Sequence, residues 1–251
     1  MNYDAFMEPL SWFLTGLEKH SDRADGHLYQ NSQAFMCTML YNMSWMQTPS
    51  MMAAMNELSN HDHSRFLTRT NRQVGRLDYR GKAAASEGIN LGIFRAAVVV
   101  QMTWPGAPTI YYGDEAGVCG WTDPDNRRTY PWGHEDKQML QFHKEAIRIH
   151  KSSTALCTGS YKMLYTAWGI LGYGRFDKNE RYAVIVNNTQ ETVNVAVPVW
   201  QIGVADGSRM EQQLMSVAES FTKVPDIYVV TDGYLMVAMP RTSAVILKDI
   251  G

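Results

Sequence analysis

Hydrophobic residues recur at helical spacing in several segments of the first 152 residues. Intervals of three and four between apolar positions predict helices over residues 8–20, 31–47, 82–102 and 135–151. Short apolar runs between these helices predict buried strands at residues 1–6, 52–58 and 109–112. Alternating strands and helices are typical of a parallel sheet.

After Ser152 the helical spacing gives way to short β-rich runs separated by turn signals such as Asp206-Gly207 and Asp232-Gly233. The runs are residues 161–168, 171–176, 181–187, 192–199, 210–217, 227–230, 234–239 and 244–248. This spacing predicts an antiparallel β-sandwich. We therefore expect two domains, an α/β domain at 1–152 and a β-sandwich at 153–251. A complete eight-stranded barrel needs about 250 residues, so the first domain can hold only part of one.

Composition excludes several classes of protein. Lys and Arg total 23 against 25 Asp and Glu, for a net charge of −2, so a nucleic-acid partner is not expected. No apolar stretch is long enough to cross a bilayer, and the first residues lack the pattern of a signal peptide. We expect no membrane association and a cytoplasmic location. Three scattered Cys argue against a disulfide scaffold or a zinc ribbon.

Asn60-His61-Asp62 directly follows an apolar strand. Polar residues at the carboxyl ends of parallel strands line the active sites of α/β folds, and a carboxylate there can stabilise a developing positive charge. Two other interpretations stay open. Asp62 can cap the following turn, or His61 and His63 can bind a metal in a metal-dependent hydrolase, although zinc needs three or four ligands.

Two further acidic segments are candidates. Residues 123–128, Asp-Pro-Asp-Asn-Arg-Arg, lie near Trp121, Tyr130 and Trp132. Aromatic rings can stack on sugar faces, and charged groups can bind hydroxyls; the alternative is a solvated turn with a local Asp–Arg pair. The paired acids Asp114-Glu115 follow a short strand, and we favour a structural role for them over a catalytic one.

Taken together, three motifs resemble the α-amylase family, glycoside hydrolase family 13, in its neopullulanase, cyclomaltodextrinase and maltogenic amylase branch. They are Asn-Glu-Leu-Ser-Asn-His-Asp at 56–62, Pro-Gly-Ala-Pro-Thr-Ile-Tyr-Tyr-Gly-Asp-Glu at 105–115 and Gly-Trp-Thr-Asp-Pro-Asp-Asn-Arg-Arg at 120–128. The resemblance implies the last part of a (β/α)8 barrel, about strands six to eight, followed by the sandwich. Residues 1–6 would be the sixth strand.

The resemblance also implies roles. Asp62 would be the third catalytic acid, which stabilises the transition state, and His61 would bind a sugar hydroxyl. Asp123 and Arg127 would bind glucose units of α-glucan oligosaccharides. No cofactor is expected; some relatives bind calcium, but no calcium site is identified in this sequence.

The family's nucleophilic Asp and proton-donating Glu should precede Asn60, and neither is present. The Arg-x-Asp look-alikes at 76–78 and 175–177 follow Asp62 in the chain, so we dismiss them. Retaining hydrolysis of α-1,4 or α-1,6 glucosidic bonds needs two carboxyl groups about 5 Å apart. We therefore expect an inactive chain that self-associates or requires the missing N-terminal barrel portion. The alternative is a non-catalytic carbohydrate-binding or interaction module.

Overall fold

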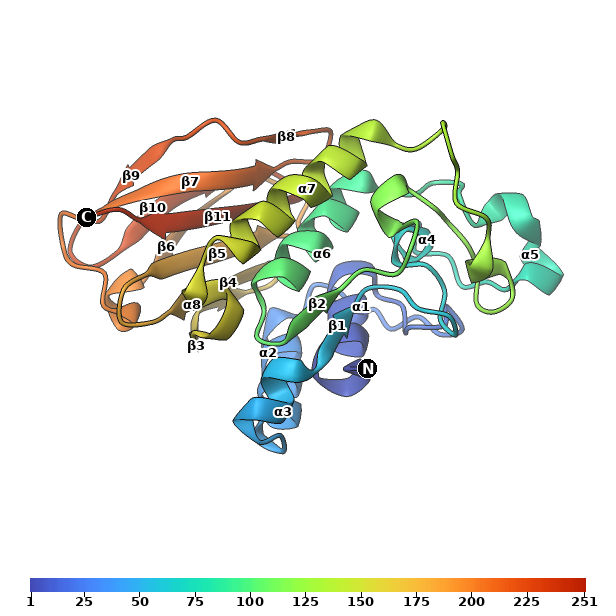
Figure 1. Cartoon of the computed structure of the whole chain (residues 1–251), viewed down its shortest axis with the longest axis horizontal. Coiled ribbons are helices and arrows are strands. Elements are labelled where there is room, and N and C mark those ends of the chain that lie inside the picture. The colour runs from blue at the N-terminus through green and yellow to red at the C-terminus, as the bar shows by residue number, and fades with distance from the viewer.

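The computed structural model describes residues 1–251. Helices and loops form one side of the molecule and antiparallel strands the other (Figure 1). The helices are α1 (Glu8–Thr15), α2 (Ser32–Ser44), α3 (Thr48–Ala53), α4 (Phe66–Arg69), α5 (Leu77–Ala84), α6 (Leu91–Thr103), α7 (Lys137–Lys151) and α8 (Thr154–Thr158). Strands β1 (Met55–Glu57) and β2 (Ala107–Thr109) pair in parallel in this region. The predicted mixture of α and β structure is therefore confirmed.

The remaining strands are antiparallel and form two sheets. They are β3 (Ser160–Ala167), β4 (Ile170–Phe176), β5 (Arg181–Asn187), β6 (Val193–Val197), β7 (Arg209–Ser216), β8 (Phe221–Thr222), β9 (Ile227–Val229), β10 (Leu235–Met239) and β11 (Ser243–Asp249). The larger, seven-stranded sheet has the order β3-β4-β5-β11-β7-β8, with β9 also paired to β7; β6 and β10 form the other sheet. All eight predicted strand runs are confirmed, and only the two-residue β8 was not predicted.

The seven-stranded sheet has a hydrophobic core on each face. On one face Tyr173, Leu214 and Ile246 belong to the same buried cluster as Phe94 of α6 and Phe142 of α7. On the other face, β5 and β11 share a second cluster with β6 and β10. In Figure 1, α6 and α7 run side by side against the sheet and separate it from the loops at the opposite end. The sheet thus anchors α6 and α7, and the chain between these two helices carries the motifs at 105–115 and 120–128.

The predicted strand at residues 1–6 is wrong, because Tyr3–Met7 form a π-helical turn that leads directly into α1. Only one strand lies beside this segment. The Asn2 amide donates to the Met55 carbonyl at 2.9 Å, and the residues that follow satisfy their backbone groups by helical hydrogen bonds instead. The predicted strand at 109–112 is also displaced, since β2 ends at Thr109.

The helix predicted at 82–102 is interrupted. The chain leaves α5 at Ala84, passes through Gly88 with a φ of +67°, and begins α6 only at Leu91. Asn90 is the N-cap, because its side chain accepts a hydrogen bond from the Ile93 amide at 2.9 Å.

The helix predicted at 8–20 ends at Thr15 before Gly16, which has a φ of +74°. One further short helix, α8, follows Ser152. No helix in the structure combines the length and apolarity that crossing a membrane requires.

Two polar side chains of β4 bind the C-terminal end of α6. Arg175 is fully buried and donates to the Thr103 carbonyl at 2.6 Å and the Gly159 carbonyl at 3.1 Å. Burial lowers its pKa to about 10. Tyr173 shares a hydrogen bond of 2.5 Å with the Thr103 hydroxyl. Arg175 is therefore a structural residue, and it does not belong to a nucleophile motif.

The Tyr173–Thr103 bond gives a first prediction. Thr103 Oγ1 also donates to the Val99 carbonyl at 2.7 Å, so Tyr173→Phe leaves that hydroxyl partnered. We expect the free energy of unfolding to fall by about 1 kcal/mol in urea denaturation. The control is Tyr161→Phe, because the Tyr161 hydroxyl donates only a weak hydrogen bond, to the Met36 sulfur at 3.4 Å. Equal effects of the two substitutions would contradict the assignment.

Candidate functional site

Asp62 and His61 lie on a turn that follows β1. The side chain of Asn60 shapes this turn, because its Oδ1 accepts hydrogen bonds from the amides of Asp62 at 2.9 Å and His63 at 3.1 Å. The side chains of His61 and Asp62 are 49% and 54% exposed, and His61 Nε2 lies 3.4 Å from Asp62 Oδ1. The turn therefore presents an imidazole and a carboxylate together to solvent.

Arg65 connects this turn to the two other motif loops. Its guanidinium is buried and donates from NH1 to Asp114 Oδ1 at 3.0 Å and to the Tyr112 carbonyl at 2.6 Å. Its Nε donates to the Asn126 carbonyl at 2.9 Å, and its backbone amide donates to the Gly120 carbonyl. A guanidinium offers five N–H donors in a fixed plane, so one side chain can fix the relative positions of all three loops.

Asn126 makes the second connection. Its side-chain amide donates to the carbonyls of Asn60 at 3.0 Å and His63 at 2.8 Å. The Asp123 amide donates to the Asp62 carbonyl at 3.3 Å. Consequently the backbone of Asp123 lies against that of Asp62, although 61 positions separate them in the sequence.

Asp123 and Arg127 form an exposed ion pair within this loop. Arg127 Nε lies 2.6 Å from Asp123 Oδ1, and each side chain is 49% exposed. A solvated pair of this kind contributes at most about 1 kcal/mol to folding. Both groups are therefore accessible to a ligand, and little stability depends on their mutual contact. The structure brings Asp123 and Arg127 together beside the turn that carries His61 and Asp62.

The paired acids Asp114 and Glu115 point elsewhere. Asp114 is buried, and burial raises its pKa, whereas the positive charge of Arg65 opposes this rise. Glu115 Oε2 accepts a hydrogen bond from the Gly113 amide at 3.0 Å. Both carboxylates therefore have structural partners, as the sequence interpretation favoured.

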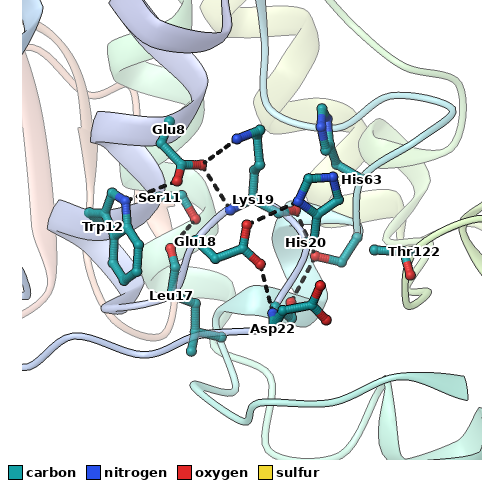
Figure 2. A network of polar contacts seen from close by, with 12 residues as sticks. Glu8, Ser11, Trp12, Leu17, Glu18, Lys19, His20, Asp22, His63 and Thr122 are labelled. Atoms are coloured by element: carbon teal, nitrogen blue, oxygen red, sulfur yellow. Dashed lines mark hydrogen bonds and ion pairs between the residues drawn. The ribbon is translucent and has the colours of Figure 1, made fainter.

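A polar network lies next to this region, in the loop after α1 (Figure 2). The side-chain atoms of Glu18, His20 and Asp22 that could bind a metal ion lie within 4.8 Å of one another. The Glu18 carboxylate accepts hydrogen bonds from His20 Nδ1 at 3.0 Å and the Asp22 amide at 2.7 Å, and the Asp22 carboxylate is bound by Arg76 through two nitrogens. Since Arg76 already pairs with Asp22 and Glu18 already accepts hydrogen bonds from His20 and the Asp22 amide, the network is a set of mutual polar contacts that closes the loop.

His63, the other histidine considered as a metal ligand, is buried. Its ring packs edge-on against His20, with centroids 4.5 Å apart, and against Tyr3 at 4.8 Å. Burial, together with the positive charge of Arg69, lowers its pKa to about 3, so it is neutral at physiological pH. Neither His61 nor His63 belongs to the one group of three potential ligands in this chain.

Sequence reasoning did not identify Arg65, Asn126 or Tyr3. The Tyr3 hydroxyl accepts a hydrogen bond from Asn60 Nδ2 at 3.1 Å, although residue 3 lies far from the turn in sequence. A lone arginine or asparagine has no periodic signal, so its role depends on contacts that only the fold creates. Asn126 lies inside the motif at residues 120–128, which is the one sign of its importance in the sequence.

Comparison with known proteins gives a consistent result. The sequence model of the family described as the α-amylase catalytic domain matches residues 13–167, more than half of the chain. An amylopullulanase of Thermoanaerobacter thermohydrosulfuricus is 30% identical over 81% of this chain and 14% of its own length. Neopullulanase 2 of Thermoactinomyces vulgaris is 31% identical over 81% of this chain and 30% of its own length. The chain thus spans less than a third of either relative.

Solved structures show the same fold. An Anoxybacillus α-amylase superposes with a TM-score of 0.74 at 20% identity, covering 97% of this chain and 45% of that one. The Nostoc punctiforme debranching enzyme gives a TM-score of 0.73 at 21% identity, covering 98% and 47% of the two chains. Almost the whole chain therefore matches about half of each of these proteins.

Proposed function

Because the chain belongs to the α-amylase family of glycoside hydrolases, we propose that residues 1–152 supply about the sixth to eighth strands of a (β/α)8 barrel and residues 153–251 a β-sandwich. The parallel pair β1–β2 supports two of these strand positions. The Asn2 amide bonded to Met55 keeps the first residues beside β1, although Tyr3–Met7 are helical and add no third strand. The core shared by the two antiparallel sheets supports the sandwich. The reaction of the complete enzyme is retaining hydrolysis of α-1,4 or α-1,6 glucosidic bonds in maltooligosaccharides, cyclodextrins or pullulan.

In this proposal the exposed turn after β1 is one side of a glucan-binding cleft. Asp62 stabilises the positive charge that develops on the sugar, and His61 binds a hydroxyl of the same unit. Asp123 and Arg127 bind neighbouring glucose units through charge-assisted hydrogen bonds. The observation that carries the proposal is the convergence of three motif loops on Arg65 and Asn126, because it joins the loop of Asp123 and Arg127 to the turn of His61 and Asp62.

The chain alone lacks the nucleophile and the proton donor that the family resemblance requires. Without a nucleophilic carboxylate the covalent route is unavailable. We therefore assign this chain glucan binding without turnover, and assign catalysis to an assembly that also contains the preceding barrel strands.

The region around β1 and β2 has room for such strands. The edge of β2 that does not pair with β1 has no strand partner. Three large side chains are exposed near these strands: Tyr41 on α2, Trp45 directly after α2, and Met55 at the start of β1. Unpaired edges and exposed apolar groups favour association. The partner in this proposal is the N-terminal barrel portion, and self-association replaces it when that portion is absent.

Arg127→Ala tests the binding role. We expect its affinity for maltohexaose to fall about 10-fold or more, because a charge-assisted hydrogen bond is lost, while the unfolding midpoint in urea stays nearly constant. Isothermal titration calorimetry measures the affinity. The matched control is Arg241→Ala, which removes another exposed ion pair, that of Arg241 with Glu219 at 2.8 Å. Equal affinities of the two variants would contradict the assignment.

A further inference from the structure

The side chain of Asn60 is buried and has a partner for each of its hydrogen-bonding groups. It is only 2% exposed. Its Oδ1 accepts from the backbone amides of Asp62 and His63. Its Nδ2 donates to Glu57 Oε2 at 3.2 Å and to the Tyr3 hydroxyl at 3.1 Å. An amide side chain offers two acceptor sites and two donor hydrogens, so these four contacts use its whole capacity.

Glu57, in β1, determines which way round this amide lies. A carboxylate accepts hydrogen bonds and donates none, whereas a hydroxyl such as that of Tyr3 does both. Only Nδ2 of Asn60 can therefore face Glu57, and Oδ1 is left to face the turn. The reversed amide would place Oδ1 against the Glu57 carboxylate and Nδ2 against the backbone amides of Asp62 and His63, which are donors themselves.

The turn that this amide shapes carries part of the candidate site. It presents the side chains of His61 and Asp62 to solvent. The backbone carbonyl of Asn60 also accepts a hydrogen bond from Asn126 Nδ2 at 3.0 Å, which connects the turn to the loop at 120–128. A displacement of Asn60 therefore reaches both exposed segments that the proposed function assigns to glucan binding.

The position is unfavourable for a charged carboxylate. Glu57 is 5% exposed, and burial raises its pKa, although the hydrogen bond from Asn60 opposes this rise. A carboxyl group whose folded pKa exceeds its unfolded pKa stabilises the fold at low pH, and that contribution is lost as the pH rises through the folded pKa. Glu57 therefore lowers stability near neutral pH relative to an uncharged acceptor. Perturbed groups of this kind are concentrated at functional sites.

We propose that Glu57 is a positioning residue, which fixes the Asn60 amide and thereby the turn that presents His61 and Asp62. Because Glu57 is buried, it acts on a bound glucan only through Asn60. The effect on glucan affinity rests on the proposed function, whereas the effect on the turn does not. The turn is followed by the exchange rates of the two backbone amides that Asn60 holds, and binding by the affinity for maltohexaose.

Glu57→Met and Glu57→Gln test this role. Methionine is similar in size but is only a weak acceptor, so the amides of Asp62 and His63 should exchange about 10-fold faster or more by nuclear magnetic resonance. Maltohexaose affinity should fall about 3- to 10-fold in isothermal titration calorimetry. Glutamine keeps an acceptor oxygen and should recover most of both properties. Glu57→Gln also removes the buried charge, so its urea midpoint at pH 7 should exceed that of the unaltered chain.

Glu145→Met is the matched control. Glu145 is also a largely buried glutamate, at 8% exposed, but it lies on α7 and pairs with Arg148 and Lys223. Its loss should lower the urea midpoint and leave the exchange of the turn amides and the affinity unchanged. An equal loss of affinity in Glu145→Met would mean that binding follows general stability, and the positioning role would be wrong.

The outcomes separate this proposal from the proposed function. If Glu57→Met matches the unaltered chain in amide exchange and in affinity, the positioning role is wrong and the proposed function stands. If Glu57→Gln is as defective as Glu57→Met, an acceptor at this position does not fix the turn, and the proposal is overturned. If exchange accelerates in Glu57→Met but the unaltered chain binds no maltohexaose, the role of Glu57 in the turn stands and the proposed function fails.

Discussion

Arg65→Ala is expected to lower the free energy of unfolding by about 3–5 kcal/mol, because it leaves the buried Asp114 carboxylate without its partner. It also removes the donor to the Tyr112 and Asn126 carbonyls, so the three motif loops lose their common contact. We expect the variant to lose maltohexaose binding even under conditions in which it remains folded. Urea denaturation followed by circular dichroism measures the stability.

The effect of Arg65→Ala should depend on pH in a defined direction. Burial already raises the pKa of Asp114 in the folded protein, and loss of the guanidinium raises it further. A carboxyl group whose folded pKa exceeds its unfolded pKa stabilises the fold at low pH, and this contribution is lost as the pH rises through the folded pKa. The variant should therefore be more destabilised at pH 7 than at pH 4.

A double variant separates the buried charge from the lost packing. Arg65→Met combined with Asp114→Leu removes both charges and fills the space with large apolar side chains. This double variant should have a higher free energy of unfolding than Arg65→Ala at pH 7. If the single and double variants are equally unstable, and the single variant shows no pH dependence, then the buried ion pair is not what makes Arg65 important for stability.

The antiparallel half of the fold was predictable because each strand is short, rich in β-branched and aromatic residues, and bounded by turn residues. The first half was less predictable. Residues 1–6 have the composition of a strand, but their conformation depends on how many strands lie beside them, and that information is absent from the local sequence. The break before α6 depends on Asn90, whose capping role competes with an apolar pattern that continues through residue 102.

The candidate site shows the same division. Asp62, His61, Asp123 and Arg127 lie in motifs with a recognisable order and spacing, so the sequence identified them, and the structure brings them to one surface. Arg65 was not identified. Its importance comes from three backbone and side-chain partners that lie 47 to 61 positions away in sequence, and such partners become neighbours only when the chain folds.

The isolated chain is expected to release no reducing sugar from maltooligosaccharides, cyclodextrins or pullulan. Enzymes of this reaction class place two carboxyl groups about 5 Å apart, one to attack and one to protonate. In this chain the acids beside Asp62 are otherwise engaged. Asp123 pairs with Arg127, and Glu57 is buried, which raises its pKa, and accepts a hydrogen bond from Asn60 at 3.2 Å. Loss of a covalent nucleophile typically lowers turnover by roughly four or more orders of magnitude.

Reducing-sugar release by the purified chain, beside Asp62→Ala and the surface control Glu191→Ala, tests whether this chain binds glucans without cleaving them. The same preparation is titrated with maltohexaose, so that a negative result comes from folded, binding-competent protein. We predict binding by the unaltered chain and equal, background release by all three proteins. The prediction would be contradicted if the unaltered chain and Glu191→Ala released reducing sugar and Asp62→Ala did not. The chain would then contain a complete catalytic site.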